Sequence, residues 1–416
     1  MPEIRPFRGV CYNLEKVGSI GKVVTEPYDV ISPQQQEAYY QLHPNNVIQL
    51  ILGKRFPGDT DRDNQYTRAR KIFKDWQKEK VLLRDQAESI YIYTQTYTSA
   101  LGQKTRTGFV ALMKLEDFAK NAVLPHENTF AHPVQDRSTL LKTVRANLSP
   151  IFALFGDPKL AITTLLKRYT KAEAPIFCFE KDGVTHRLWR LSDKKSIAAI
   201  KRALKDKQIF IADGHHRYEA ALSNKKDYNY VMTYFTATTD PGLTILPTHR
   251  VVKINEQQKI PTLIKHLQKN FTFRHFSAAE ELLSFLEQAP QRQSVFGVYA
   301  KGEGFFSLML TKNPPAKKLA QKNHFVRDNL DAAILHREIL GKNSGLTLAE
   351  DDILYTRDSK EAVQLVQSNK YQLAFFLRPP TIEQVTKVAR AGERMPHKTT
   401  YFYPKVFSGL VINPLE

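Results

Sequence analysis

Residues 213–217, Asp-Gly-His-His-Arg, carry more chemically capable side chains than a connecting turn needs. They follow the apolar run 209–212 and precede an amphipathic pattern that begins with Tyr218, Ala221 and Leu222, which predicts a buried strand, a glycine turn and a helix. The start of a helix presents unpaired N–H groups and the positive end of the helix dipole. The turn is therefore a candidate anion site.

The side chains of this turn fit the binding of a phosphate group. Gly214 allows the tight turn, and Arg217 offers a planar fork of donors that would hold a phosphate together with the helix N–H groups. Asp213 could hold a divalent metal or orient a hydroxyl, while His215 and His216 could donate to phosphate oxygens or move a proton. The alternative is structural, with Asp213 capping the helix and the histidines as surface polar groups. A zinc site is disfavoured because adjacent histidine side chains diverge.

A second segment, Pro125-His126-Glu127-Asn128, contains a carboxylate next to an imidazole. Glu127 could act as a general base if it faces the anion site, and otherwise it is a surface acid in a loop. Residue 130 is Phe, so the HExxH pattern of zinc proteases is absent.

Two further segments supply candidate ligand-binding residues. Arg145 and Asn147, two residues apart, could both face a ligand, or Asn147 could simply form a turn before Pro150. The tail around Lys398 is dense in aromatic residues and lysines, so it either packs back across the central site or pins the terminus to the core.

Two motifs favour structural interpretations. The segment Glu26-Pro27-Tyr28-Asp29 is typical of a proline-containing turn with acids, although it could also reach a site. Pro247-Thr248-His249-Arg250 lies within a strand pattern, where one histidine is more typical of a packed core residue.

Several common catalytic motifs are missing from the chain. No GxxxxGK[ST] is present and no GxGxxG follows a strand, which argues against a P-loop and a Rossmann fingerprint. Neither GxSxG nor a Cys–His pattern points to a covalent hydrolase.

The elements that must position these residues are predicted from periodicity. Segments 89–98 and 105–116 predict one hairpin, and 175–191, which contains a DG turn, predicts a second. Charged amphipathic helices are expected over 59–80 and 194–207, and helices alternate with strands after residue 257. With 416 residues, the chain is too long for one typical core. We expect an α+β protein with regions 1–120, 121–256 and 257–416.

Composition restricts the partners. The 61 Lys and Arg exceed the 42 Asp and Glu, for a formal charge of +19, but the basic residues are dispersed. This favours anionic metabolites or nucleotides as partners over nucleic acid, which the charge alone does not exclude. Cys11 and Cys178 are isolated, and the start of the chain lacks the apolar segment of a signal peptide. We expect a cytoplasmic protein without a membrane span, and a homodimer is compatible with the sequence.

Seven blocks together resemble a widespread bacterial family of unknown function: RPFRGVCYN, EPYDVIS, LPHENT, RANLSPIF, ADGHHRYEAA, PTHRVV and KTTYFYPKVFSGLV. The block ADGHHRYEAA is also similar to the strand–loop–helix motif of the ParB/sulfiredoxin superfamily, especially of the free L-serine kinases, in which this turn binds nucleotide phosphates. The resemblance implies a ParB/sulfiredoxin-like mixed core with N-terminal and C-terminal α/β additions.

The resemblance to the serine kinases also implies an activity and its residues. Glu127 would be the base, and Asp213, His215, His216 and Arg217 would hold phosphate, metal and hydroxyl. The expected reaction is phosphoryl transfer from ATP or ADP, with Mg²⁺, to a small hydroxylated metabolite, with L-serine as the first choice. The carboxylate of serine would need a cationic partner such as Arg145 or a lysine of the 398–405 segment. The alternative is a nucleotide-binding regulatory or nucleic-acid-binding ParB-like protein without turnover of a small molecule.

Overall fold

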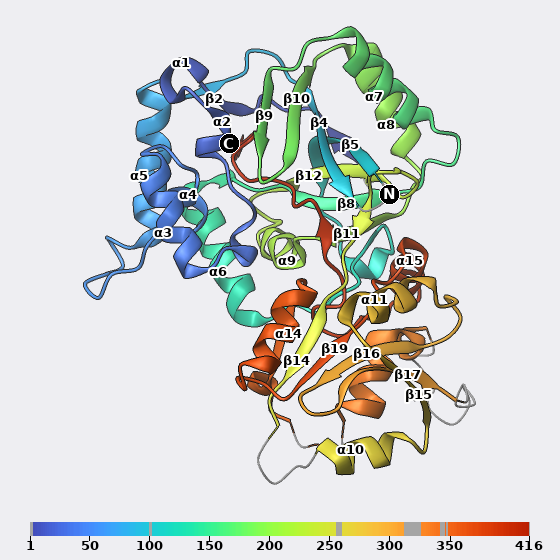
Figure 1. The fold of residues 1–416 in the computed structure, drawn as a ribbon. Coiled ribbons are helices and arrows are strands. Elements are labelled where there is room, and N and C mark those ends of the chain that lie inside the picture. The colour runs from blue at the N-terminus through green and yellow to red at the C-terminus, as the bar shows by residue number, and fades with distance from the viewer. Residues whose placement is uncertain are drawn as a thin grey trace. The chain divides into compact units, whose positions relative to one another are not determined.

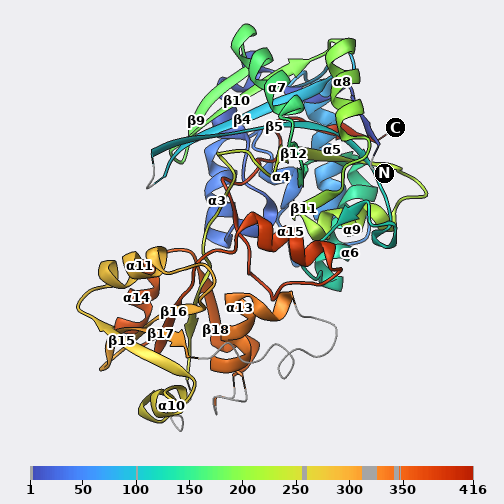
Figure 2. The same cartoon turned by 90° about the vertical axis from the view of Figure 1, so that its right-hand side faces the viewer.

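The computed structural model describes residues 3–99, 102–254, 260–311, 326–341, 346 and 348–415. These residues group into two compact units (Figures 1 and 2). The first unit contains residues 3–244 together with 404–415, and the second is Ile245–Tyr403. The last segment of the chain therefore belongs to the first unit. Across the described part of the chain, no helix is long and apolar enough to span a membrane.

The first unit is built on a large mixed sheet with strand order β6-β11-β8-β12-β5-β4-β10-β9 and β1 beside β5. The pairs β11–β6 and β12–β8 are parallel, whereas the other pairs are antiparallel. The expected α+β class is confirmed. The strands are β1 (Ile4–Arg5), β4 (Ile90–Ser99), β5 (Gly102–Lys114), β6 (Val123–Leu124), β8 (Ile151–Phe155), β9 (Phe177–Lys181), β10 (Val184–Leu191), β11 (Ile209–Asp213) and β12 (Tyr230–Ala237).

Both predicted hairpins are confirmed. Strand β4 pairs with residues 102–110 of β5, and β9 pairs with β10. Asp182 and Gly183 both have positive φ at the second turn, 51° and 71°, which is the backbone that a two-residue DG turn requires.

The helices of the first unit follow from their sequence patterns. In α5, Asn64 forms a capping box with Thr67, and Ala69, Phe73 and Trp76 form the buried face. Residues from α6, α7, α8 and α9 join the sheet in one hydrophobic core. The helices are α1 (Leu14–Val17), α2 (Ile20–Val23), α3 (Pro33–Leu42), α4 (Ile48–Ile51), α5 (Gln65–Lys78), α6 (Ala131–Val144), α7 (Ala161–Ala172), α8 (Lys194–Leu204) and α9 (His215–Ser223).

The last residues of the chain are fastened to the first unit by backbone pairing. Strand β21 (Asn413–Pro414) pairs with β7 (Ala146–Asn147), and Ile412 bridges to Val10 in β2 (Val10–Tyr12), which pairs with β3 (Leu82–Arg84). Segment 404–415 thus lies in the unit that carries the Asp-Gly-His-His-Arg turn.

The second unit is an antiparallel sheet with strand order β15-β17-β16-β19-β14-β18 and a hydrophobic cluster on each face. The expected alternation of helices and strands after residue 257 is confirmed for the described residues. The strands are β14 (His249–Val252), β15 (Phe271–Phe276), β16 (Val295–Ala300), β17 (Gly304–Leu310), β18 (Ile353–Thr356) and β19 (Leu373–Phe376). The helices are α10 (Ile260–Leu267), α11 (Ala279–Gln288), α13 (Asp331–Ile334), α14 (Ser359–Gln367) and α15 (Ile382–Arg390).

Two buried histidines and one partly buried histidine predict that the fold loses stability in mild acid. Burial lowers the pKa of His186 to about 3 and the pKa values of His249 and His336 to about 4. Between about pH 6.5 and pH 4 the unfolded chain therefore binds protons that the folded chain excludes, so the free energy of unfolding falls as the pH falls. We expect a loss of roughly 2 kcal/mol per histidine at about pH 5. Thermal unfolding at about pH 7 and pH 5 measures it, and equal midpoints would contradict the prediction.

Candidate functional site

The turn at the end of β11 has the backbone that the sequence predicts. Gly214 has φ 89° and ψ 30° and stands at the N-cap of α9, which begins at His215. The cap residue is a glycine without a side chain, and the oxygens of Asp213 accept hydrogen bonds from Lys405 and Arg217. The start of α9 carries the positive end of the helix dipole next to these residues.

Gly214 is also required by the side chain that packs over it. A Cβ atom built at this position would lie 2.9 Å from the Cζ atom of Arg217, and the positive φ is unfavourable for any L side chain. The glycine therefore serves both the turn and the placement of the guanidinium.

Replacing Gly214 by alanine should destabilise the protein and displace Arg217. We expect a loss of about 1–2 kcal/mol in the free energy of unfolding, because an alanine at this φ is strained. Gly156→Ala is the matched control, since a Cβ there meets no atom within 4 Å. Chemical denaturation of both variants checks the prediction, and equal stabilities would contradict it.

Asp213 is the centre of a largely buried ion network. One of its oxygens accepts a hydrogen bond from Lys405, and the other accepts one from Arg217 at 2.8 Å. Arg217 also donates to the carbonyl oxygen of Pro150. Burial alone would raise the pKa of Asp213, but the charges of Lys405 and Arg217 outweigh burial and hold the pKa below its ordinary value. Asp213 is therefore an ionised carboxylate that positions two cations.

The loop that carries Glu127 lies against the start of α9. The backbone N–H of His126 donates to Nε2 of His215 at 3.3 Å, and the two rings meet edge to face. The ring of His126 is fully buried and its Nδ1 lies 2.8 Å from the carbonyl oxygen of Ile211 in β11. Segments almost 90 residues apart in sequence (126 and 215) are thus held together by both histidines.

Glu127 lies between these two imidazoles. Its Oε2 is 3.7 Å from Nδ1 of His215, and its Oε1 is 3.9 Å from Nε2 of His126. Because Nε2 of His215 accepts a hydrogen bond, a neutral His215 carries its proton on Nδ1, toward the carboxylate. The side chain of Glu127 is 27% exposed, so it is oriented by its neighbours and still reachable from solvent.

His216, the next residue of α9, holds the end of the same loop. Its Nε2 accepts a hydrogen bond from the backbone N–H of Phe130 at 3.1 Å, and the two rings stack. Burial lowers the pKa of His216, although the charges of Asp29, Glu127 and Glu219 oppose the shift. His216 is therefore a neutral imidazole at neutral pH, with its proton on Nδ1.

The motif Glu26-Pro27-Tyr28-Asp29 also lies at this site, although its sequence is equally typical of a structural turn. The charge of Asp29 acts on His216, and Arg217 acts on the Tyr28 hydroxyl, whose pKa burial raises to about 12. Tyr28 and Arg217 line one pocket together with Arg137 and Asn147. The signal that could have identified this segment is its combination of an acid and an aromatic residue in one turn.

Tyr28 and Arg137 line a second and larger pocket of about 380 Å³. The Arg137 guanidinium stacks on the Tyr28 ring at 3.9 Å and is paired with Asp136. Arg55 and His132 supply further cationic or polar groups on its wall. This volume fits a ligand larger than a single phosphate.

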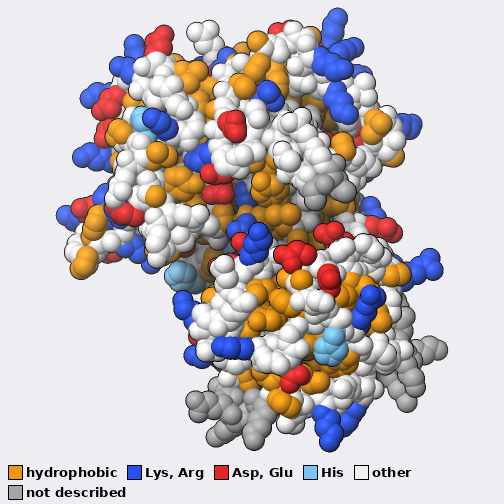
Figure 3. Space-filling view, in the orientation of Figure 1, with side chains coloured by type: hydrophobic (Ala, Val, Ile, Leu, Met, Phe, Trp, Pro, Cys, Tyr) orange, Lys and Arg blue, Asp and Glu red, His pale blue; other side chains and the backbone are white. Residues whose placement is uncertain are grey.

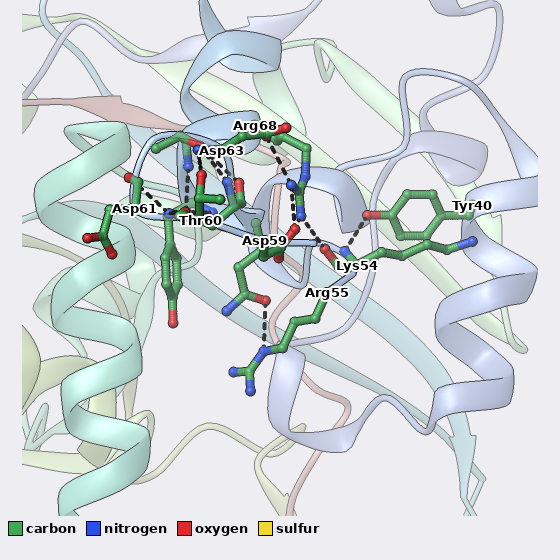
Figure 4. Close-up of polar contacts among 12 residues, drawn as sticks. Tyr40, Lys54, Arg55, Asp59, Thr60, Asp61, Asp63 and Arg68 are labelled. Atoms are coloured by element: carbon green, nitrogen blue, oxygen red, sulfur yellow. Dashed lines mark hydrogen bonds and ion pairs between the residues drawn. The ribbon is translucent and has the colours of Figure 1, made fainter. Parts of the chain in front are cut away.

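The loop between α4 and α5 forms part of the wall of this larger pocket and is braced by ionic contacts (Figure 4). Arg68 from α5 pairs with Asp59 and Asp63, and it donates to the carbonyl oxygen of Lys54. The part of the pocket wall next to Arg55 is thus an ordered loop that ionic contacts attach to α5.

The remaining predicted residues have other surroundings. Arg145 is exposed at the end of α6 in the left-handed conformation, where its carbonyl oxygen accepts a hydrogen bond from Leu415. The amide oxygen of Asn147 accepts hydrogen bonds from Met232 and Asn413, so this side chain holds strands together although it also lines the smaller pocket.

Lys398 lies at an exposed turn of the second unit, where its carbonyl oxygen accepts a hydrogen bond from Arg250. The lysine that contacts Asp213 is Lys405, seven residues later in the tail. The sequence feature that indicates the role of Lys405 is its position in the run Pro404-Lys405-Val406-Phe407. A lysine among buried apolar residues requires an acidic partner.

The donor set for a metal is sparse. Across the described residues, no three His, Cys, Asp or Glu side chains gather to hold an ion. Both oxygens of Asp213 already accept hydrogen bonds from cations, so Mg²⁺ on Asp213 does not fit this arrangement.

Comparison with known proteins assigns the chain to a family. Residues 4–333 match the family described as "Protein of unknown function (DUF1015)", and the chain belongs to it. No curated protein matches the chain.

Several solved structures show remote likeness. A conserved hypothetical protein from Pyrococcus furiosus is 16% identical, with a TM-score of 0.33 over 71% of this chain and 92% of that one. A mutant free serine kinase in complex with AMP is 13% identical, with a TM-score of 0.36 over 70% of this chain and 86% of that one. Another, in complex with ADP, is 12% identical, with a TM-score of 0.36 over 74% and 90%. These likenesses are remote, and the function proposed below depends on the chain's own residues.

Proposed function

We propose that the chain is a nucleotide-dependent phosphotransferase that phosphorylates a small hydroxylated metabolite, with free L-serine as the first acceptor to test. The observation that carries the proposal is the position of Glu127. Its carboxylate lies 3.7 Å from the side chain of His215, the first residue of helix α9. A general base and an anion site thus belong to one cluster, as phosphoryl transfer to a hydroxyl requires.

The start of α9 is suited to the phosphates. Its dipole favours a negative charge, and Gly214 lets the Arg217 guanidinium pack against the turn. Arg217 uses two of its five N–H donors on Pro150 and Asp213, which fixes the orientation of its guanidinium beside the turn. A bound ATP or ADP would supply the phosphoryl group, and we assign its larger part to the pocket lined by Tyr28 and Arg137.

Glu127 would take the proton of the acceptor. The acceptor oxygen forms a bond to phosphorus while the bond from phosphorus to the bridging oxygen of the nucleotide breaks, and the hydroxyl proton passes to the Glu127 carboxylate. The proton on Nδ1 of His215 faces this carboxylate and orients it. Asp213 acts through Arg217 and Lys405, and His216 positions the loop through Phe130. No step is assigned to Mg²⁺ on Asp213.

The proposal also concerns the fold of the core that carries the site. The order strand β11, Gly214 turn and helix α9, with the Glu127 loop beside it, supports a ParB/sulfiredoxin-like core for this part of the first unit. The regulatory or nucleic-acid-binding alternative has less support. On the face drawn in Figure 3, Lys and Arg side chains are interspersed with acidic and apolar ones and form no continuous basic surface.

The direct test is product formation. The full-length protein is incubated with ATP or ADP, Mg²⁺ and L-serine, and phosphoserine is measured by mass spectrometry, followed by a panel of other small alcohols. We expect phosphorylation of at least one acceptor with one of the two nucleotides. Nucleotide binding without any product across the panel would overturn the kinase proposal and favour the regulatory alternative.

A further inference from the structure

Arg250 in the second unit is a buried cation with an incomplete set of partners. It lies on β14, between β18 and β19, and only 1% of the residue is exposed. Its Nη atoms donate to the carbonyl oxygens of Thr248 and Lys398, whereas its Nε is buried without a hydrogen-bond partner. Burial lowers the pKa of Arg250 to about 10, so the guanidinium remains charged at neutral pH.

No carboxylate balances this charge within the described part of the chain. An aromatic ring lies against the guanidinium, since the Cζ atom of Arg250 is 5.4 Å from the ring centroid of Tyr355. Arg378, the neighbouring arginine, has a carboxylate partner, Asp331, at 3.2 Å. An isolated charge removed from water is costly, and pairing with an opposite charge offsets that cost.

Arg250 and Arg378 line the same cavity. Two threonines, Thr248 and Thr399, add hydroxyl groups, and Gln384 in the first turn of α15 adds an amide. With Asp331 as the carboxylate on the wall, the charged lining carries one excess positive charge. The cavity measures about 20 Å³, which suits one small group and excludes a nucleotide.

We propose that this cavity of the second unit binds a single oxyanion group, the carboxylate or phosphate of a small molecule, with Arg250 as its charge partner. The planar guanidinium and the hydroxyl and amide donors match both kinds of oxyanion. The site consists only of residues of the second unit and does not depend on the phosphotransferase proposal.

Hydrogen exchange followed by mass spectrometry tests the site in the full-length protein. Inorganic phosphate and acetate are added separately, at constant ionic strength against chloride, and the two arms distinguish phosphate from carboxylate recognition. We expect saturable protection of peptides covering 246–252 and 377–384 by at least one of them, with exchange about tenfold slower at ten times the Kd. Protection confined to residues 213–218 would report on the proposed phosphotransferase site and would overturn the second site.

Variants separate binding from structural support. Arg250→Met should abolish the protection, and without added anion it should be at least as stable as the unmodified protein, because an unbalanced buried charge is removed. Arg274→Met is the matched control, since Arg274 is exposed on β15 and lies outside the cavity. If Arg250→Met does not fold, Gln384→Ala should weaken the protection. Full protection in Arg250→Met or in Gln384→Ala, or no protection by either anion in the unmodified protein, would overturn the proposal.

Discussion

Replacing Glu127 by glutamine should reduce phosphoryl transfer by about 10²- to 10⁴-fold, the usual range for the loss of a general base. Glutamine keeps the shape of the side chain and its contacts with His126 and His215, but it cannot accept the hydroxyl proton. Nucleotide binding should persist, because the phosphates are assigned to the start of α9 and to Arg217. The measurements are product formation with each nucleotide and the thermal shift that the nucleotide produces.

The control for this variant is Glu88→Gln, which removes the carboxylate of an exposed glutamate that is not part of the candidate site. We expect its activity to match that of the unmodified protein. If Glu127→Gln retained full activity, the base would have to be another group. If Glu127→Gln lost the nucleotide-induced shift as well, Glu127 would act in binding and not in proton transfer.

Local pattern was sufficient to predict most of the elements. The hairpin with Asp182 and Gly183 follows from the positive φ that both residues accept, and helix α5 follows from its cap at Asn64 and its apolar spacing. The turn at Gly214 was predictable for the same reason, because the change from a run of apolar residues to a period of 3.6 occurs within a few residues.

The assembly of the candidate site was not predictable from local pattern. Glu127 is oriented by His215, and Asp213 is paired with Lys405, which is 192 residues away in sequence. No periodicity encodes such pairings, since they depend on which strands and loops the tertiary fold brings together. The sequence does not distinguish Lys398 from Lys405, because the two lysines differ in burial and not in residue type.

The structural role of Arg145 and Asn147 illustrates a second limit. Residues before a proline read equally well as a ligand-binding pair or as a turn. The structure gives the backbone of this segment a structural role, since β7 pairs with β21 near the end of the chain. A strand partner that is distant in sequence cannot be predicted from the local pattern of residues.

Replacing Asp213 by alanine should destabilise the first unit by about 3–5 kcal/mol, because it leaves two buried cations without their carboxylate. The side chain of Lys405 is only 6% exposed and that of Arg217 only 10%, so water cannot replace the lost partner fully. For a unit of this size the thermal midpoint should fall by roughly 6–20 °C. The double variant Asp213→Ala/Lys405→Met should recover part of this loss, because it removes one of the unpaired charges.

The double variant separates two roles for Asp213. If the carboxylate positions Arg217 and Lys405, stability falls in Asp213→Ala and recovers in part in the double variant. Nucleotide affinity falls in both, because Arg217 has lost its partner. If Asp213 instead held a metal, Asp213→Ala would lose activity with little change in stability, and Lys405→Met would not compensate.

Because the pKa of Asp213 is depressed, its contribution to stability is present above the ordinary aspartate pKa and is lost only as the pH falls through the lowered value. The thermal comparison at neutral pH therefore measures the ion network itself.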